Sequence, residues 1–78
     1  MSKKQIEECV RASLEGYFVD LRGTEPDRMY DMLVKVVEKP LLEIVMKQAD
    51  QNQSRAAEWL GLNRNTLRKK LIEHKLLK

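Results

Sequence analysis

Hydrophobic residues recur at steps of three and four along the first part of the chain. This spacing places them on one face of a helix, because an α-helix completes a turn every 3.6 residues. The pattern predicts an amphipathic helix over about 5–21, and Gly23 follows it as a stop signal. The apolar stripe consists of Ile6, Cys9, Val10, Leu14, Tyr17, Phe18 and Leu21.

The next segment is apolar over most of its circumference. Thr24, Pro26 and Asp27 are typical of a helix start, so a second helix is predicted over about 27–49. A helix that is apolar on several sides must be buried on more than one of them, and a short chain cannot cover it alone. A second copy would provide the cover, so we expect a homodimer. The apolar positions are Met29, Tyr30, Met32, Leu33, Val34, Val36, Val37, Leu41, Leu42, Ile44, Val45 and Met46.

Pro40 lies inside this second helix. It removes one backbone hydrogen bond and crowds the preceding turn, which predicts a kink. The alternative is two helices separated at Pro40, but no turn-forming residue accompanies the proline.

Two short helices are predicted in the C-terminal third. Asn52 caps a third helix over 53–60, Gly61 ends it, and Asn63 caps a fourth helix over 64–74. Trp59 is expected in the core beneath this elbow rather than as a wedge between DNA bases. The residues expected between the two helices are Ala56, Ala57, Leu60, Leu62, Leu67 and Leu71.

These elements predict an all-α protein of four helices with one structural domain. Residues 1–51 would form the dimerisation helices, and residues 52–78 would form a helix-turn-helix unit.

Charge is divided unevenly between these two parts. Residues 1–51 hold 8 Lys or Arg against 10 Asp or Glu, a net of −2, whereas residues 52–78 hold 7 against 2, a net of +5. A basic C-terminal third favours a polyanionic partner, although a solvated basic tail would give the same balance.

The basic and amide side chains of the elbow have the chemistry of a DNA-binding surface. Arg is suited to a bidentate contact with guanine and Asn to adenine, and residues early in the second helix of this motif meet base edges. The start of the third helix offers backbone N–H groups to an anion. The candidate DNA-binding residues from this spacing are Arg64, Asn65 and Arg68 at the bases, and Asn52, Ser54, Thr66, Lys69 and Lys70 at the phosphates.

Several other classes of function find no support in the sequence. A single cysteine, Cys9, excludes an internal disulfide, and with His74 it makes too few ligands for zinc. No nucleophile–base set or phosphate loop occurs, so we expect no enzyme, no metal and no cofactor. His74 is expected at the surface. No apolar run has the length of a membrane span and no secretory signal precedes the first helix, which favours the cytoplasm.

The elbow resembles the C-terminal motif of the Fis family of bacterial nucleoid-associated proteins. The likeness rests on residues 52–57, 61–64 and 66–71, and continues upstream through Tyr17-Phe18, Tyr30, Pro40-Leu41-Leu42 and Val45-Met46. The resemblance implies an intertwined homodimer with a four-helix core. It also implies paired helix-turn-helix units that bend DNA with an A/T-rich centre, acting in the bacterial nucleoid and on transcription.

By matching residues, the resemblance makes Arg64 the main base contact and places Asn52 and Asn63 near bases or backbone. The phosphate contacts it implies are Ser54, Arg55, Thr66, Arg68, Lys69 and Lys70. The mobile N-terminal arm of longer members does not precede the first helix, so activation of an invertase is not expected. Gln51 stands at a turn position where Fis-family members commonly have glycine, so the resemblance leaves the local backbone conformation open.

Two other functions fit the same residues. The elbow could be the helix-turn-helix module of an enhancer-binding transcription activator. Alternatively, the chain could be a helical adaptor that binds a protein, not DNA, through its apolar second helix.

Overall fold

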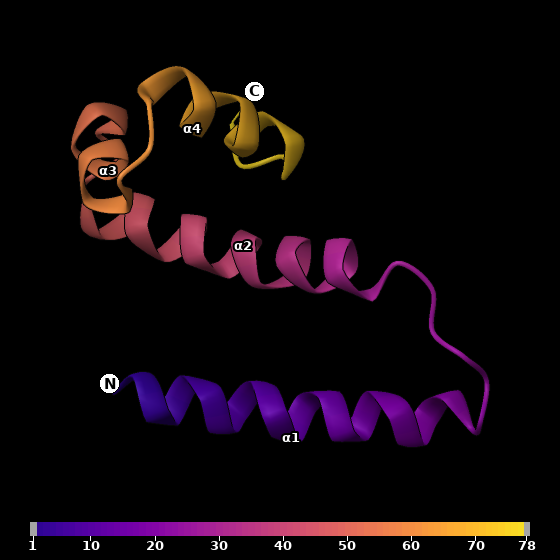
Figure 1. Ribbon diagram of the computed structural model, residues 1–78. Helices are drawn as coiled ribbons and strands as arrows, with labels where there is room; N and C mark the ends of the chain where they lie inside the picture. The colour runs from indigo at the N-terminus through magenta and orange to yellow at the C-terminus, as the bar shows by residue number, and fades with distance from the viewer. Residues whose placement is uncertain (1, 78) are drawn as a thin grey trace.

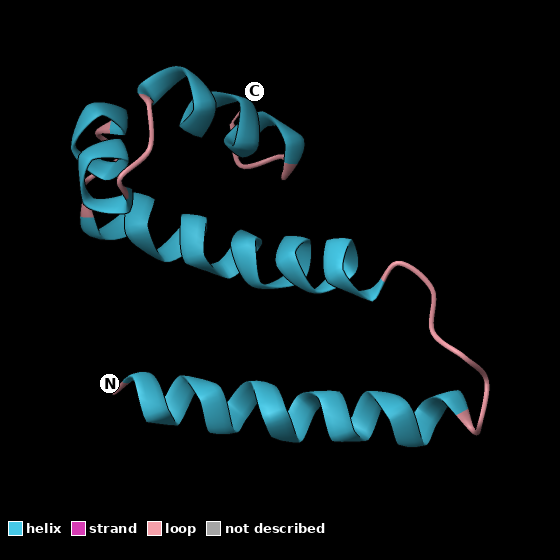
Figure 2. Ribbon diagram, viewed as in Figure 1, coloured by secondary structure: helices cyan, strands magenta, loops and turns pink. Residues whose placement is uncertain are grey.

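The computed structural model describes residues 2–77, which fold into four helices (Figure 1). The helices are α1 (Lys3–Leu21), α2 (Met29–Gln48), α3 (Gln53–Leu60) and α4 (Arg64–Glu73). Within residues 2–77 the remaining backbone is turn or loop, without a strand (Figure 2). The predicted all-α class is therefore confirmed, and the predicted bounds of α3 and α4 agree with the structure to within one residue.

Helix α1 begins two residues earlier than predicted because of a reciprocal cap. The backbone N–H of Gln5 donates to Oγ of Ser2 at 3.2 Å, and the backbone N–H of Ser2 donates to Oε1 of Gln5 at 2.9 Å. This capping box satisfies two backbone donors at the helix end.

The start predicted for α2 was wrong by two residues. The N-cap is Arg28, which has a left-handed backbone (φ 51°) and makes no capping bond with its side chain. Thr24 does not cap α2, because it lies in the turn after α1, where its backbone N–H donates to the carbonyl of Leu21 at 3.0 Å. Arg28 compensates locally through an ion pair with Asp31 at 3.1 Å.

Helix α2 continues through Pro40 without a break. The alternative of two separate helices is therefore excluded. No turn-forming residue stands beside Pro40 to end the helix. A single proline removes only one backbone hydrogen bond, and the turns on either side keep α2 continuous. The kink remains a prediction.

The core lies at one end of the molecule. It joins the C-terminal half of α2 to the α3–α4 elbow, whereas α1 contributes no buried residue. In Figure 1 α1 and α2 run alongside one another as long rods, and α3 and α4 fold back over the end of α2. The buried residues are Leu42, Met46, Ala49, Ala56, Ala57, Leu67 and Leu71.

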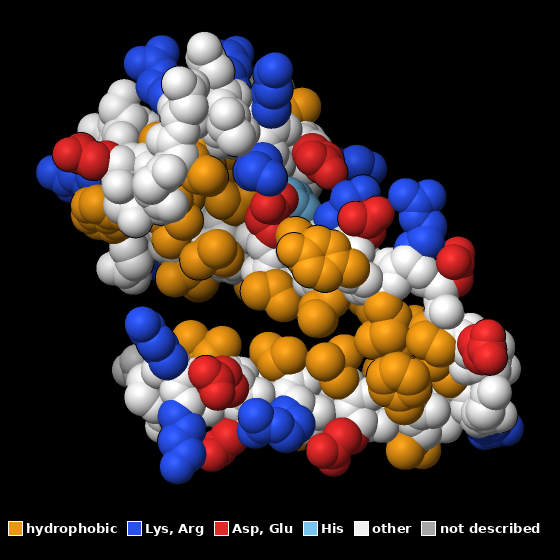
Figure 3. Space-filling model, in the orientation of Figure 1, with side chains coloured by type: hydrophobic (Ala, Val, Ile, Leu, Met, Phe, Trp, Pro, Cys, Tyr) orange, Lys and Arg blue, Asp and Glu red, His pale blue; other side chains and the backbone are white. Residues whose placement is uncertain are grey.

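Large apolar side chains remain exposed along α1 and along the second face of α2. Figure 3 shows hydrophobic side chains on both sides of the gap between these helices. The radius of gyration is 15.0 Å, against about 11.5 Å expected for a compact chain of this length. A single chain is therefore extended, and it leaves many large apolar side chains of α1 and α2 in contact with water. The exposed apolar residues of α2 include Val34, Val37, Leu41 and Ile44, and those of α1 include Ile6 and Phe18.

Trp59 does not lie in the core, contrary to the sequence prediction. Its side chain is 56% exposed, and the Arg55 guanidinium lies over its ring at 6.0 Å from the centroid. The small residues Ala56 and Ala57 occupy the buried face of α3 instead. A close approach between α3 and α4 needs small side chains there, which leaves the indole on the outer face.

Replacing Trp59 with alanine is expected to lower the free energy of unfolding by only about 0.5–1 kcal/mol. This is the size of an exposed cation–π contact, and well below the roughly 3–5 kcal/mol of a buried tryptophan. Urea unfolding at a fixed chain concentration measures the difference. A loss above about 2 kcal/mol would show that the indole is buried in solution.

Candidate nucleic-acid interface

The turn before α3 places the first predicted DNA-binding residue at a helix N-terminus. Asn52 has an extended backbone, and its Oδ1 accepts a hydrogen bond from the backbone N–H of Arg55 at 3.1 Å. The predicted cap is confirmed. Because its oxygen is used in the cap, the side-chain NH₂ of Asn52 is the group that can donate to a ligand.

The turn between α3 and α4 depends on a glycine. Gly61 adopts the left-handed conformation (φ 72°), and the backbone N–H of Leu62 donates to the carbonyl of Ala57 at 2.9 Å. This hydrogen bond spans six residues, gives a partner to a carbonyl at the end of α3 and turns the chain sharply. Asn63 then caps α4, accepting from the backbone N–H of Asn65 at 2.8 Å.

The packing of the elbow turns the polar side chains outward. Leu67 and Leu71, one turn apart on α4, are 0% and 2% exposed and pack against α2 and α3. Most side chains on the other faces of α4 then point to solvent. The predicted DNA-binding residues that are exposed are Asn52, Ser54, Arg55, Asn63, Arg64, Asn65, Thr66, Arg68 and Lys69.

Two of these residues, one from each helix, come together. The Nη1 atom of Arg64 at the start of α4 donates to Oγ of Ser54 in the first turn of α3 at 3.5 Å. This long contact between exposed side chains brings the guanidinium beside the N-terminus of α3, whose first-turn backbone N–H groups have no partner within the helix and can bind an anion. One small area combines a cation, a hydroxyl group and backbone donors.

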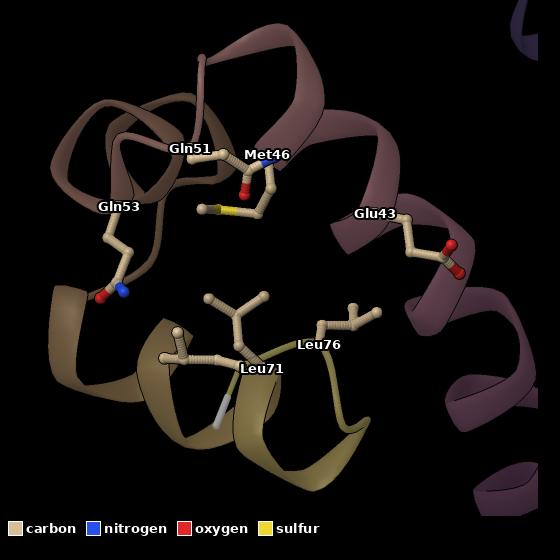
Figure 4. A pocket seen from close by; sticks show the side chains of 7 residues that line it. Glu43, Met46, Gln51, Gln53, Leu71 and Leu76 are labelled. Carbon is tan, nitrogen blue, oxygen red and sulfur yellow. The ribbon is translucent and has the colours of Figure 1, made fainter.

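The cavity in Figure 4 is lined by the C-terminal half of α2, the start of α3 and the end of the chain after Leu71. It has a volume of about 290 Å³, and Met46 and Leu71 point toward one another across it. Its polar lining consists of Gln51, Gln53 and one carboxylate, Glu43. This lining brings no acid–base pair together.

Residues 33–74, from the first turns of α2 through α4, match the sequence profile of the family described as "Bacterial regulatory protein, Fis family". The chain belongs to the Fis family. The matched residues include the C-terminal part of α2 and the whole elbow. The buried core and the exposed polar surface of the elbow therefore both lie within the match to the Fis family.

Individual members of the Fis family match almost the whole chain. A Fis-like protein of Ralstonia nicotianae is 56% identical over 77 residues, which are 99% of this chain and 100% of the relative. A Fis-like protein of Neisseria meningitidis is 62% identical over 72 residues, 92% of this chain and 91% of the relative. The DNA-binding protein Fis of Photobacterium profundum is 44% identical over 74 residues, 95% of this chain and 76% of the relative.

Gln51, at the position where glycine is familiar in the Fis family, has a left-handed backbone. Its φ is +63°, and the preceding Asp50 has a φ of +53°. The left-handed region costs a residue with a side chain about 1–2 kcal/mol. The backbone N–H of Gln51 donates to the carbonyl of Met46 at 2.8 Å, which ends α2 and holds this conformation.

Lys70 differs from the other predicted DNA-binding residues because its charge is paired with a carboxylate. Its Nζ atom forms an ion pair with Oε2 of Glu38 on α2 at 2.9 Å, and its side chain is 33% exposed. His74 is also not the isolated surface residue predicted from the sequence. Its Nε2 atom lies 2.8 Å from Oε1 of Glu38, and its side chain is only 9% exposed. Local spacing could not reveal the role of Glu38, because Glu38 lies 32 residues from Lys70 and 36 residues from His74 in the sequence.

These two partners lower the pKa of the Glu38 carboxyl below its usual value of 4.5. The hydrogen bond from Lys70 is the largest cause, and partial burial opposes it. Bonds that favour the ionised carboxylate stabilise the folded chain whenever that carboxylate is charged.

The contribution of Glu38 to stability is therefore expected to disappear in acid. It is fully present above the usual pKa of 4.5 and is lost as the pH falls through the lowered folded-state value. Urea midpoints of the wild type and Glu38→Gln, compared from about pH 5.5 to about pH 3, should converge toward the acid end. A difference that stays constant over this range would show that the carboxylate charge contributes nothing.

Two further properties concern the described part of the chain. Residues 2–77 contain no cluster of three His, Cys, Asp or Glu side chains that could hold a metal ion. None of the four helices combines the length and the apolar character needed to cross a membrane.

Proposed function

We propose that this Fis-family chain binds double-stranded DNA as a homodimer and bends it, with α4 as the recognition helix. The Arg64–Ser54 contact carries the proposal, because it joins the predicted DNA-binding residues of two helices at one exposed surface. Arg64 lies in the first turn of α4, the part of a recognition helix that reads base edges. The relatives named as Fis and Fis-like DNA-binding proteins support the DNA-binding part of the proposal.

The exposed side chains around Arg64 fall into two groups by chemistry. Asn63 and Asn65 can donate amide N–H groups to bases or backbone beside the Arg64 contact. The others offer hydroxyl, guanidinium or ammonium groups to phosphates, which position the protein without reading sequence. The proposed phosphate contacts are Asn52, Ser54, Arg55, Thr66, Arg68 and Lys69, all exposed.

The uncovered apolar face supports the homodimer. One face of α2 packs Leu42 and Met46 onto the elbow, while Val37 and Leu41 on the other face are 44% and 49% exposed. A groove of about 380 Å³ runs along that second face, and it is lined by Val10 of α1, by apolar residues of α2 and, at one edge of the lining, by Glu38. The same face of a second chain is a self-complementary cover for it.

Two copies would present two α4 helices to one duplex. The resemblance to Fis implies that these helices lie closer than one turn of straight DNA, so that the duplex must curve to meet both. A sequence with an A/T-rich centre bends at lower energy, which gives preference at positions that no side chain touches. The resemblance to Fis also implies action as a nucleoid-associated protein and transcriptional regulator.

Replacing Arg64 with alanine is expected to weaken binding to the preferred site by about 1–3 kcal/mol and to reduce discrimination between sites. The substitution removes a bidentate donor but leaves the buried leucines of α4 in place. Fluorescence anisotropy on two duplexes that differ at the contacted base pair measures both effects.

Arg11→Ala on the exposed surface of α1 is the matched control, since it removes the same charge far from the elbow. It should leave affinity nearly unchanged. Equal losses for Arg64→Ala and Arg11→Ala would assign the effect to net charge and remove Arg64 from the base contacts.

A further inference from the structure

One carboxylate on α2 holds two side chains of α4. The Oε2 atom of Glu38 contacts Nζ of Lys70 at 2.9 Å, and its Oε1 atom contacts Nε2 of His74 at 2.8 Å. Lys70 and His74 are one helical turn apart, so both point from α4 toward α2. Both oxygens of Glu38 are thus engaged, and its side chain is only 17% exposed.

This cluster differs from an ordinary surface ion pair. Lys35 and Glu73 also join α2 to α4, but their charged atoms are 3.9 Å apart and their side chains are 65% and 54% exposed. Exposed pairs of this kind contribute little because water and salt screen them. The bonds of Glu38 are short, charge-assisted and partly screened from water, so breaking them leaves a charge without its partner.

The Glu38 bonds also affect which cations of α4 can reach DNA. Arg68 and Lys69 are exposed, whereas Lys70 lies against α2. A phosphate that takes Lys70 must compete with a carboxylate already at hydrogen-bonding distance. Moving the Lys70 ammonium to a phosphate would leave one oxygen of Glu38 without a partner.

We propose that Glu38 is a positioning residue that fixes α4 on α2 and withholds Lys70 from the DNA phosphates. This inference rests on the proposed DNA binding and deepens it. Glu38 connects the apolar helix α2 to the recognition helix, so it sets the direction in which α4 meets the groove. It also reduces by one per chain the number of phosphates that the protein neutralises.

The salt dependence of DNA binding tests this inference directly. Each phosphate neutralised changes the slope of log affinity against log salt by about −0.9. In Glu38→Gln the neutral amide holds the ammonium less strongly, so Lys70 becomes available. The slope should steepen by about one per chain, or about two per dimer. Adding Lys70→Ala to Glu38→Gln should return the slope to the wild-type value.

Glu73→Gln is the control for charge, because it removes one negative charge from the other α2–α4 pair. It should leave the slope unchanged. If Glu38→Gln binds DNA with the wild-type slope, or if its steeper slope persists in the double variant, the proposal is overturned. Far-ultraviolet circular dichroism of each variant verifies that α4 is folded.

The single variant Lys70→Ala decides the matter if Glu38→Gln does not fold. Withheld by Glu38, Lys70 adds nothing to the wild-type slope, so Lys70→Ala should retain that slope. A slope flatter by about one per chain would show Lys70 on a phosphate and contradict the proposal. Failure of the wild type to bind any duplex would instead refute the proposed function.

Discussion

Replacing Leu67 with alanine is expected to unfold the helix-turn-helix and to abolish DNA binding. Leu67 is 0% exposed and lies on α4 within the cluster that includes Leu42 of α2 and Ala57 of α3. Truncating a buried leucine costs about 2–5 kcal/mol, a large part of the roughly 5–15 kcal/mol that stabilises a typical domain. The core of this chain is small, so few other contacts can compensate.

The measurement is thermal unfolding followed by circular dichroism, with anisotropy on a DNA duplex. Ile72→Ala is the matched control, because Ile72 lies on the same helix and is 48% exposed. It should cost about 1 kcal/mol or less. Chain concentration must be equal in all samples, since the stability of a dimer depends on it. A stable, DNA-binding Leu67→Ala protein would contradict the packing of the elbow.

Placing a charge on the uncovered face of α2 is expected to separate the proposed dimer. Val37 is 44% exposed and lies in the apolar groove beside Val34 and Leu41. In a dimer, Val37→Asp would bury an unpaired carboxylate between two chains. In the separated chains the same carboxylate would be hydrated, which is far more favourable. The separated chains would lose DNA affinity by about 10²–10⁴-fold, because two linked contacts bind more tightly than one.

Light scattering after size-exclusion chromatography gives the mass, and anisotropy gives the affinity. Val19→Asp is the matched control. It makes the same substitution on α1, where Val19 is 73% exposed and lies opposite the apolar stripe. This variant should remain a dimer and bind normally. A Val37→Asp protein that is still dimeric would show that the partner covers another face.

Local signals made the elbow predictable from the sequence. Asn52, Gly61 and Asn63 each determine the backbone at their own position through a cap or a left-handed turn. These effects act within a few residues, so α3 and α4 could be placed almost to the residue. The spacing of Leu67 and Leu71 then determined which side chains of α4 point outward.

Three features of the structure were missed, each for its own reason. Trp59 was assigned to the core from its size and apolar character, but it lies one turn from Arg55 on α3, and that spacing could have indicated an outer face. The contacts of His74 and Lys70 were out of reach for a different reason. Their partner Glu38 belongs to another helix, and no local pattern reveals such a pairing. Arg28 was missed because its left-handed backbone occurs without the usual glycine.

The most direct test of DNA binding and bending is fluorescence anisotropy with two duplexes over a series of salt concentrations. The duplexes have the same flanks, and one has an A/T-rich centre while the other has a G/C-rich centre. We expect tighter binding to the A/T-rich duplex, with a log–log salt slope of about −5 if each chain neutralises about three phosphates through Arg55, Arg68 and Lys69. Equal affinity for both centres would contradict recognition by bending, and no binding at low salt would contradict DNA binding altogether.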